Sequence, residues 1–196
     1  MTGIPPADDT PTTRLATSVV RRLVERGLTV GTAESLTGGL VCAALTTVPG
    51  ASAVVRGGVV AYASDVKAAV LGVDRRLIER DGAVSASVAS ALAEGVRRVL
   101  PSAVGVSTTG VAGPDPAEGA PVGTVFLAAS GPWGILVEEH AFTGDREEIR
   151  AASVGAALRL LHRGLQNLRD AVGASEYRGP QPDRPAHPDE GEEVPS

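Results

Sequence analysis

Apolar residues recur at helical spacing near the start of the chain, in the segment RLATSVVRRLVERG, residues 14–27. Residues three and four apart lie on the same face of a helix, so this spacing predicts an amphipathic helix. Gly27 follows the last apolar position and is a typical helix stop. The apolar positions that would share one face are Leu15, Val19, Val20, Leu23 and Val24.

Short apolar, β-branched runs bounded by glycine or proline predict strands. The first, LTVGTA, is apolar enough to be buried. The last two flank a Gly-Pro dipeptide, which predicts a hairpin. The predicted strands cover residues 28–33, 54–62, 103–110, 124–130 and 134–142.

Helical segments separate these strands. We expect Ser64 and Ser85 to act as N-caps, and Pro101 to end the helix that Ser85 begins. The last helix has acids in its first turn and bases late, as the helix dipole prefers. Alternating strands and helices predict an α/β domain with a mainly parallel sheet, which the late hairpin makes mixed. The predicted helices cover residues 40–47, 64–71, 85–100 and 144–168.

The two ends of the chain differ from this pattern, because residues 1–12 and 170–196 hold eight of the 14 prolines and few apolar residues. Such segments bury too little apolar surface to offset chain entropy, so we predict disorder at both ends and a folded domain over 13–169. Residues 170–196 also carry seven acids against two arginines, which accounts for the whole net charge of −5. The near-neutral remainder gives no electrostatic reason to expect nucleic-acid binding.

Cysteine and histidine usage narrows the chemistry. A single cysteine, Cys42, excludes an intramolecular disulfide, and no Cys/His cluster has zinc spacing, so we expect no metal. The N-terminus lacks the basic and apolar regions of a signal peptide, and no segment is long and apolar enough to span a membrane. We therefore expect a soluble, cytoplasmic protein without a membrane partner.

The first candidate site is TAESLTGG, residues 32–39, where a buried strand runs into a tight turn and a helix. Loops at the carboxyl ends of strands bind ligands in open α/β sheets, and free amides at a helix start can stabilise an anion. Ser35 would lie near those amides. Considered alone, the motif favours a simpler interpretation in which Ser35 or Thr37 is an N-cap and the glycines allow close packing.

The second candidate site is Lys67, the only lysine among 18 basic residues, the other 17 being arginine. A lysine ammonium can lose its proton inside a protein, whereas a guanidinium in effect never does. Tyr62 ends a predicted strand and Lys67 lies on the next helix, so both could face Ser35. The alternative is a solvated surface lysine, which most lysines are.

A third candidate combines TTGVAGP, residues 108–114, with PVGTV, residues 121–125. A strand that ends in Thr-Thr-Gly before a Gly/Pro-rich loop can form a pocket wall with backbone donors. The motif is neither a Walker motif nor GxGxxG, and an ordinary loop with turn prolines is the alternative.

A fourth candidate is FTGDREEIR, residues 142–150. Arg146 and Arg150 are four residues apart on one predicted helical face and could clamp a phosphate or carboxylate. Equally, they could be a solvated pair balanced by the neighbouring acids Asp145, Glu147 and Glu148.

Six motifs in one order, AESLTGG, GGVVAYASDVKAAVLGV, GAVS, TTGVAGP, PVGTV and GDREEIR, together resemble the CinA C-terminal domain family of nicotinamide-nucleotide amidohydrolases. The resemblance covers Leu15 to Leu168, without the additional N-terminal domain of longer CinA proteins. It implies a three-layer α/β/α fold, a homodimer and no cofactor. It also implies deamidation of a small-molecule nucleotide, nicotinamide mononucleotide, to nicotinate mononucleotide and ammonia.

The same resemblance implies site residues. Ser35 would be the nucleophile, Lys67 its base, and Tyr62 would orient Lys67 or tune its pKa. We expect amides of the 36–39 turn to hold the oxyanion and Arg146 to bind the phosphate, with Glu34 as a second possible base. The expected substrate-binding residues are Glu34, Leu36, Thr37, Gly38, Gly39, Thr109, Gly110 and Arg146.

Two other functions remain open at this point. One is a non-catalytic nucleotide-binding or regulatory module that keeps the pocket. The other is an amidase for a different small amide, because Asp115-Pro116 interrupts the Gly-rich stretch usual after AGP in the family.

Overall fold

A five-stranded sheet lies at the centre of the computed structural model, which describes residues 10–171. The strand order is β2-β1-β3-β4-β5. β1 pairs in parallel with β2 and β3, and the β3–β4 and β4–β5 pairs are antiparallel. The sheet is therefore mixed, and β3 is the strand at which it changes from parallel to antiparallel pairing. The strands are β1 (Val30–Glu34), β2 (Val55–Val60), β3 (Val104–Gly110), β4 (Thr124–Gly131) and β5 (Gly134–Ala141).

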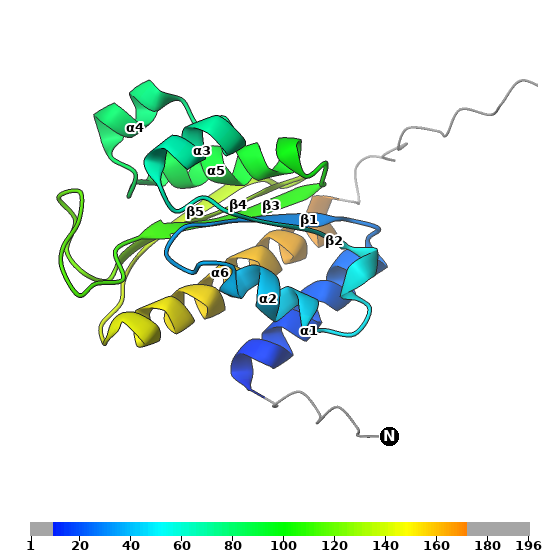
Figure 1. Cartoon of the computed structure of the whole chain (residues 1–196). Coiled ribbons are helices and arrows are strands. Elements are labelled where there is room, and N and C mark those ends of the chain that lie inside the picture. Colours follow the sequence, from blue (N-terminus) through cyan, green and yellow to red (C-terminus); the bar gives the residue numbers. More distant parts are fainter. Residues whose placement is uncertain (1–9, 172–196) are drawn as a thin grey trace, which may run out of the picture.

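Helices cover both faces of this sheet, which gives three layers, α/β/α (Figure 1). One layer holds α1, α2 and α6, and the other holds α3, α4 and α5. A short 3-10 helix, η1 (Ala51–Ala53), precedes β2. The fold class predicted from the sequence is confirmed. The helices are α1 (Pro11–Glu25), α2 (Leu40–Thr46), α3 (Ser64–Leu71), α4 (Arg75–Asp81), α5 (Ala86–Val99) and α6 (Arg146–Ala171).

Burial along the strands follows their place in the sheet. Every residue of β1 is buried, because this central strand is covered by helices on both faces. The edge strand β5 alternates exposed and half-buried residues after its first two positions, as expected for a strand with one face toward solvent. The parallel strands β1 and β3 are therefore almost fully buried, whereas the edge strand β2 alternates half-buried and exposed residues.

Two local predictions about helices are wrong. Val24 is 51% exposed, while the apolar face of α1 is formed by Ala16, Val19, Val20 and Leu23. The N-cap of α3 is Ala63, which makes no side-chain cap bond, and Ser64 is the first helical residue. In contrast, Ser85 does cap α5, where its Oγ accepts the amide of Val88 at 3.4 Å.

Helix α4 was not predicted, because none of its residues is buried and its sequence, RRLIERD, has no apolar stripe. Asp74 caps it by accepting the amide of Arg76. The cap starts the helix, and its half-buried residues Leu77 and Ile78 pack on the apolar cluster that contains Leu71.

The chain ends lie mostly outside the described residues. Thr10 caps α1, so Pro11 and Thr12 are helical although the sequence placed them in the disordered N-terminal segment. Helix α6 likewise continues to Ala171, past the predicted limit of the folded domain at residue 169. The rest of both predicted disordered segments lies outside residues 10–171.

Gly95 allows α3 and α5 to approach closely. A Cβ at this position of α5 would collide with the carbonyl oxygen of Leu71 in α3. Leu71 is buried in the apolar cluster between α3, α5 and the sheet. Because Lys67 lies one turn before Leu71, this contact seats the helix face that carries the lysine.

No helix within residues 10–171 is long and apolar enough to cross a membrane.

Candidate active site

Ser35 lies at the edge of the sheet where the parallel strands β1, β2 and β3 end. It follows β1 directly, and its backbone N–H donates to the Thr108 carbonyl of β3 at 3.0 Å. The Ser35 side chain is only 8% exposed. The carboxyl ends of parallel strands thus fix the position of the serine, which is where open α/β sheets bind ligands.

Glu34, the residue before Ser35, is a buried anchor for helix α2. Its carboxylate accepts the Thr32 and Thr37 hydroxyls at 3.0 and 2.7 Å. It also accepts three backbone N–H groups, from Gly39, Val41 and Cys42, at 2.8 to 3.0 Å. These five donors occupy both oxygens, and an anion at a helix start is favoured by the helix dipole. Glu34 is thus committed to holding the turn that follows Ser35.

Lys67 is the buried partner of Ser35. It comes from α3, is 2% exposed, and its Nζ lies 3.2 Å from Ser35 Oγ. The same Nζ donates to the carbonyls of Ala61 and Tyr62, each at 3.0 Å. The surface-lysine interpretation is therefore wrong, because all polar contacts of this amine are internal.

Burial is the main influence on the charge of Lys67. Desolvation lowers the pKa of the amine from its ordinary value of 10.5, and the Glu118 carboxylate acts in the opposite direction by raising it. The combination lowers the pKa, which increases the share of neutral amine near neutral pH.

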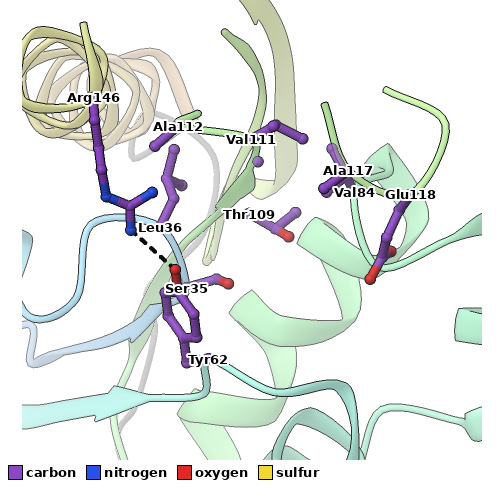
Figure 2. Close-up of a pocket in the computed structure, with 11 residues that line it drawn as sticks. Ser35, Leu36, Tyr62, Val84, Thr109, Val111, Ala112, Ala117, Glu118 and Arg146 are labelled. Carbon is purple, nitrogen blue, oxygen red and sulfur yellow. Dashed lines mark hydrogen bonds between the residues drawn. The ribbon is translucent and has the colours of Figure 1, made fainter. Parts of the chain in front are cut away.

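A cavity of about 180 Å³ opens beside Ser35 (Figure 2). Its walls are polar and apolar in about equal measure, with charged groups at two sides. The lining residues are Ser35, Leu36, Tyr62, Val84, Thr109, Gly110, Val111, Ala112, Ala117, Glu118 and Arg146. A larger hollow of about 370 Å³, lined by Glu94, Arg97, Arg98 and Ser102, contains none of the predicted site residues.

Arg146 and Tyr62 form one rim of this cavity. Arg146 donates to the Tyr62 hydroxyl at 3.0 Å, the dashed line in Figure 2, and to the Gly113 carbonyl at 2.6 Å. Tyr62 is 61% exposed. Its hydroxyl thus accepts from Arg146, and Tyr62 contacts Lys67 through its backbone carbonyl, which accepts from Nζ.

Arg150 lies apart from Arg146 and does not line the cavity. Its guanidinium donates to the carbonyls of Leu36 and Thr37, at 3.0 and 3.2 Å. The two arginines therefore do not form the joint clamp considered from the sequence. Arg150 ties α6 to the turn after Ser35, and Arg146 remains open to a ligand.

The expected residues of the 36–39 turn divide into two kinds. Leu36 lines the cavity, whereas Thr37 is fully buried and Gly38 and Gly39 are not among the lining residues. The Gly38 amide donates to the Ser35 carbonyl and the Gly39 amide to Glu34. The amide of this turn left to meet an oxyanion in the cavity is that of Leu36.

Thr109 and Gly110 both line the cavity, at the end of β3. The Thr109 hydroxyl donates to the Ala83 carbonyl at 2.7 Å, which fixes the loop before α5. A Cβ at Gly110 would come within 2.6 Å of the Thr124 carbonyl oxygen, so glycine allows β3 and β4 to stay close here.

Glu118 was missed by the sequence analysis. It lies in the loop between β3 and β4, with φ of 52°, and its carboxylate accepts the Ala83 amide at 2.6 Å. Nothing in the spacing of the loop sequence DPAEG marks this residue, because its contacts come from a segment some thirty-five positions earlier. Within residues 10–171 no group of three or more His, Cys, Asp or Glu side chains is placed to hold a metal ion.

Comparison with known proteins agrees with this architecture. The chain is 49% identical over 150 residues to a CinA-like protein of Frankia casuarinae, covering 76% of this chain and 35% of that protein. It is also 49% identical over 148 residues to a putative competence-damage inducible protein of Desulforamulus reducens, covering 76% and 36%. The chain thus spans about a third of the length of these curated relatives.

Two solved structures match over nearly their whole length. A competence-damaged protein (CinA) superfamily protein from Klebsiella pneumoniae has a TM-score of 0.78 at 33% identity, covering 81% of this chain and 99% of that one. A competence/damage inducible protein from Agrobacterium tumefaciens has a TM-score of 0.76 at 37% identity, covering 83% and 99%. The sequence profile of the CinA C-terminal domain matches residues 12–165, and the chain belongs to that family.

Proposed function

We propose that this domain is a Ser-Lys amidohydrolase that converts nicotinamide mononucleotide to nicotinate mononucleotide and ammonia. The observation that carries the proposal is the 3.2 Å approach of Lys67 Nζ to Ser35 Oγ, with the lysine almost fully buried beside an open cavity. A serine hydroxyl is a weak nucleophile until a nearby base takes its proton.

The contacts of Lys67 suit a neutral amine. A neutral amine has two N–H donors and one lone pair, and two of its three partners are carbonyls, which only accept. In the neutral form the two donors would go to Ala61 and Tyr62, which leaves the lone pair for the proton of Ser35 Oγ, 3.2 Å away. Burial supports the same protonation state, since desolvation lowers the pKa of the amine.

In the first half of the reaction, Ser35 Oγ attacks the carboxamide carbon and its proton moves to Lys67 Nζ. The carbonyl oxygen becomes an oxyanion in a tetrahedral intermediate. As the C–N bond breaks, the Lys67 ammonium returns the proton to the departing nitrogen, which leaves as ammonia. The product of this half is an ester between Ser35 and the pyridine acid, and Lys67 is again neutral.

The oxyanion needs donors that are already in place. We assign the amide of Leu36, because Gly38 and Gly39 donate elsewhere and Thr37 is fully buried outside the cavity. The Glu34 carboxylate binds the amides at the start of α2, which follows the turn. The Arg150 guanidinium of α6 donates to the carbonyls of the turn. A turn fixed from both sides costs little reorganisation when charge develops.

In the second half, water attacks the ester carbon and gives a proton to Lys67. The C–O bond to Ser35 then breaks, and Lys67 returns a proton to the serine oxygen. Nicotinate leaves as a carboxylate, with its proton released to solvent. The same lysine therefore serves as base and acid in both halves.

Cavity size limits which part of the substrate is enclosed. A volume of about 180 Å³ is smaller than the roughly 300–1,000 Å³ of pockets that hold drug-sized ligands. We infer that the pyridine amide enters the cavity and the ribose phosphate extends past its rim. Arg146, exposed on that rim, is our assignment for the phosphate.

Ammonia release from nicotinamide mononucleotide tests this function. We expect turnover by the wild type and a loss of about a hundredfold or more in Ser35→Ala and Lys67→Arg, because each removes one partner of proton transfer. Ser90→Ala is the matched control, since its hydroxyl only donates to Ala86 within α5. It should keep wild-type turnover, and circular dichroism should verify that all variants fold.

Near-normal turnover by folded Lys67→Arg would contradict the lysine base, because arginine cannot accept the proton. Tight nucleotide binding without ammonia release would favour the regulatory module instead. Release from other small amides, but not from this nucleotide, would keep the Ser-Lys chemistry and change the substrate.

A further inference from the structure

Glu118 stands on the side of the cavity opposite Arg146 (Figure 2). Its Oε2 is held by the Ala83 amide at 2.6 Å, and Ala83 is in turn held through its carbonyl by Thr109. The carboxylate is thus fixed by a loop that packs on β3, although the residue itself is exposed.

The charge of Glu118 is not neutralised by a neighbour. Within residues 10–171 no arginine or lysine forms an ion pair with it. The carboxylate also influences the neighbouring base, since it raises the pKa of Lys67, which contacts Ser35. A ligand between these residues therefore meets a fixed negative charge.

We propose that Glu118 is a specificity residue that selects amides whose ring carries a positive charge. This inference rests on the proposed function, because the pyridine of nicotinamide mononucleotide is a pyridinium cation bonded to ribose through its nitrogen. With its carboxamide at Ser35, the cationic ring occupies the space between the serine and Glu118. A neutral aromatic amide of the same shape gains nothing from the carboxylate.

The remaining walls strengthen this selection. Leu36, Val84, Val111 and Ala112 are apolar, and apolar walls reduce the screening of a charge contact. The two ends of the cavity also have opposite charge, with Arg146 on one side and Glu118 on the other. This arrangement matches a ligand with a cationic ring and an anionic phosphate.

Binding of a cationic ring also affects the protonation of Lys67, the proposed base. A cationic ring beside Glu118 offsets the negative charge that favours the Lys67 ammonium. The neutral amine is then favoured when a cationic substrate is bound. A neutral amide leaves the Glu118 charge uncompensated and lacks this effect.

The test uses a pair of substrates that differ in ring charge, nicotinamide mononucleotide and benzamide riboside 5′-phosphate. Glu118→Gln removes the charge but keeps an oxygen that can accept the Ala83 amide. Asp115→Asn is the matched control, because it removes a charge from the same loop and does not line the cavity. kcat/KM is compared at a pH above the range in which the rate rises with pH, where Lys67 is already neutral.

In Glu118→Gln we expect kcat/KM for the cationic nucleotide to fall about fivefold to tenfold, as for one partly screened charge contact. The value for the neutral isostere should stay within about twofold, and Asp115→Asn should change neither. Equal losses for both substrates would show a structural role only, and no loss for the cationic one would also overturn the proposal.

Binding to Ser35→Ala by calorimetry separates this inference from the proposed function. If wild type releases no ammonia but Ser35→Ala prefers the cationic nucleotide, and the added Glu118→Gln change removes that preference, then the charge inference stands alone. If ammonia is released without any dependence on Glu118, the proposed function stands and this inference falls. If no binding occurs, both fall.

Discussion

Two glutamates border Ser35, one before it in the chain and one across the cavity, and they differ in how many donors they meet. Glu34 is 2% exposed and accepts five hydrogen bonds, three of them from amides at the start of α2. Glu118 is exposed on the cavity wall and accepts one, from Ala83. A carboxylate whose lone pairs are filled by the protein stabilises the fold, whereas one with open lone pairs can act on a ligand.

The two arginines of the GDREEIR motif differ in their position relative to the cavity. Arg150 donates to two carbonyls of the turn after Ser35 and does not line the cavity. Arg146 lies on the rim with its charge open to solvent. Each arginine makes two internal hydrogen bonds, so what distinguishes them is that only Arg146 lines the cavity.

The largest expected effect is on stability. Glu34→Gln should reduce the free energy of unfolding by about 3 kcal/mol or more, because one amide oxygen cannot accept five donors and its NH₂ group faces them. Glu118→Gln should change it by less than about 0.5 kcal/mol, as for an exposed side chain. Urea denaturation of both variants measures the difference. Equal stability of the two variants would break the comparison.

An effect of intermediate size on the kinetics should distinguish Arg150 from Arg146. Arg150→Ala should lower ammonia release about tenfold with the nucleotide and with its dephosphorylated riboside alike, because the oxyanion turn loses an anchor. Arg146→Ala should raise KM about tenfold for the nucleotide and much less for the riboside, because the hydrogen bonds to Tyr62 and Gly113 are lost for both substrates and the phosphate contact for the nucleotide alone. Steady-state kinetics with both substrates tests this. A riboside rate that falls equally in both variants would refute the phosphate assignment.

The smallest effect is a change in pH dependence. Lys67 is active when neutral, so kcat/KM should rise with pH through a pKa below 10.5, the ordinary value that burial lowers. Glu118 raises that pKa, so Glu118→Gln should move the rising limb to lower pH, and Asp115→Asn should leave it in place. A pH–rate profile of the three proteins measures this. A limb that moves to higher pH in Glu118→Gln would contradict the assigned influence on Lys67.

Much of the fold could be predicted from sequence, because long apolar patterns dominate burial. The strands, the hairpin around Pro132 and the capped helix α5 follow from local residues. Helix α4 could not be predicted, because it begins at a side-chain cap and has no apolar stripe. The exposure of Val24 could not be predicted either, because it depends on where α1 packs against its neighbours.

The residues of the candidate site also divide into those that the sequence indicated and those that it did not. Ser35 and Lys67 could be proposed from a motif and from an unusual composition, and each is placed at the predicted strand edge. The internal roles of Glu34 and Arg150 could not, because hydrogen-bond partners from distant segments decide them. Glu118 gave no sequence signal, since an acid in a loop is ordinary until its contacts are known.

The amino-acid pattern was enough to give the order of the strands and of every helix except α4, the family of the chain, and a single lysine side chain able to lose its proton. The three-dimensional arrangement was needed to show that the amine of this lysine lies 3.2 Å from Ser35 Oγ, and that Glu118 rather than Glu34 lines the cavity. The two kinds of property differ in the distance along the chain over which they are set. Helix and strand formation depends on neighbours along the chain, whereas charge and reactivity depend on burial and on partners that the fold brings together from far apart.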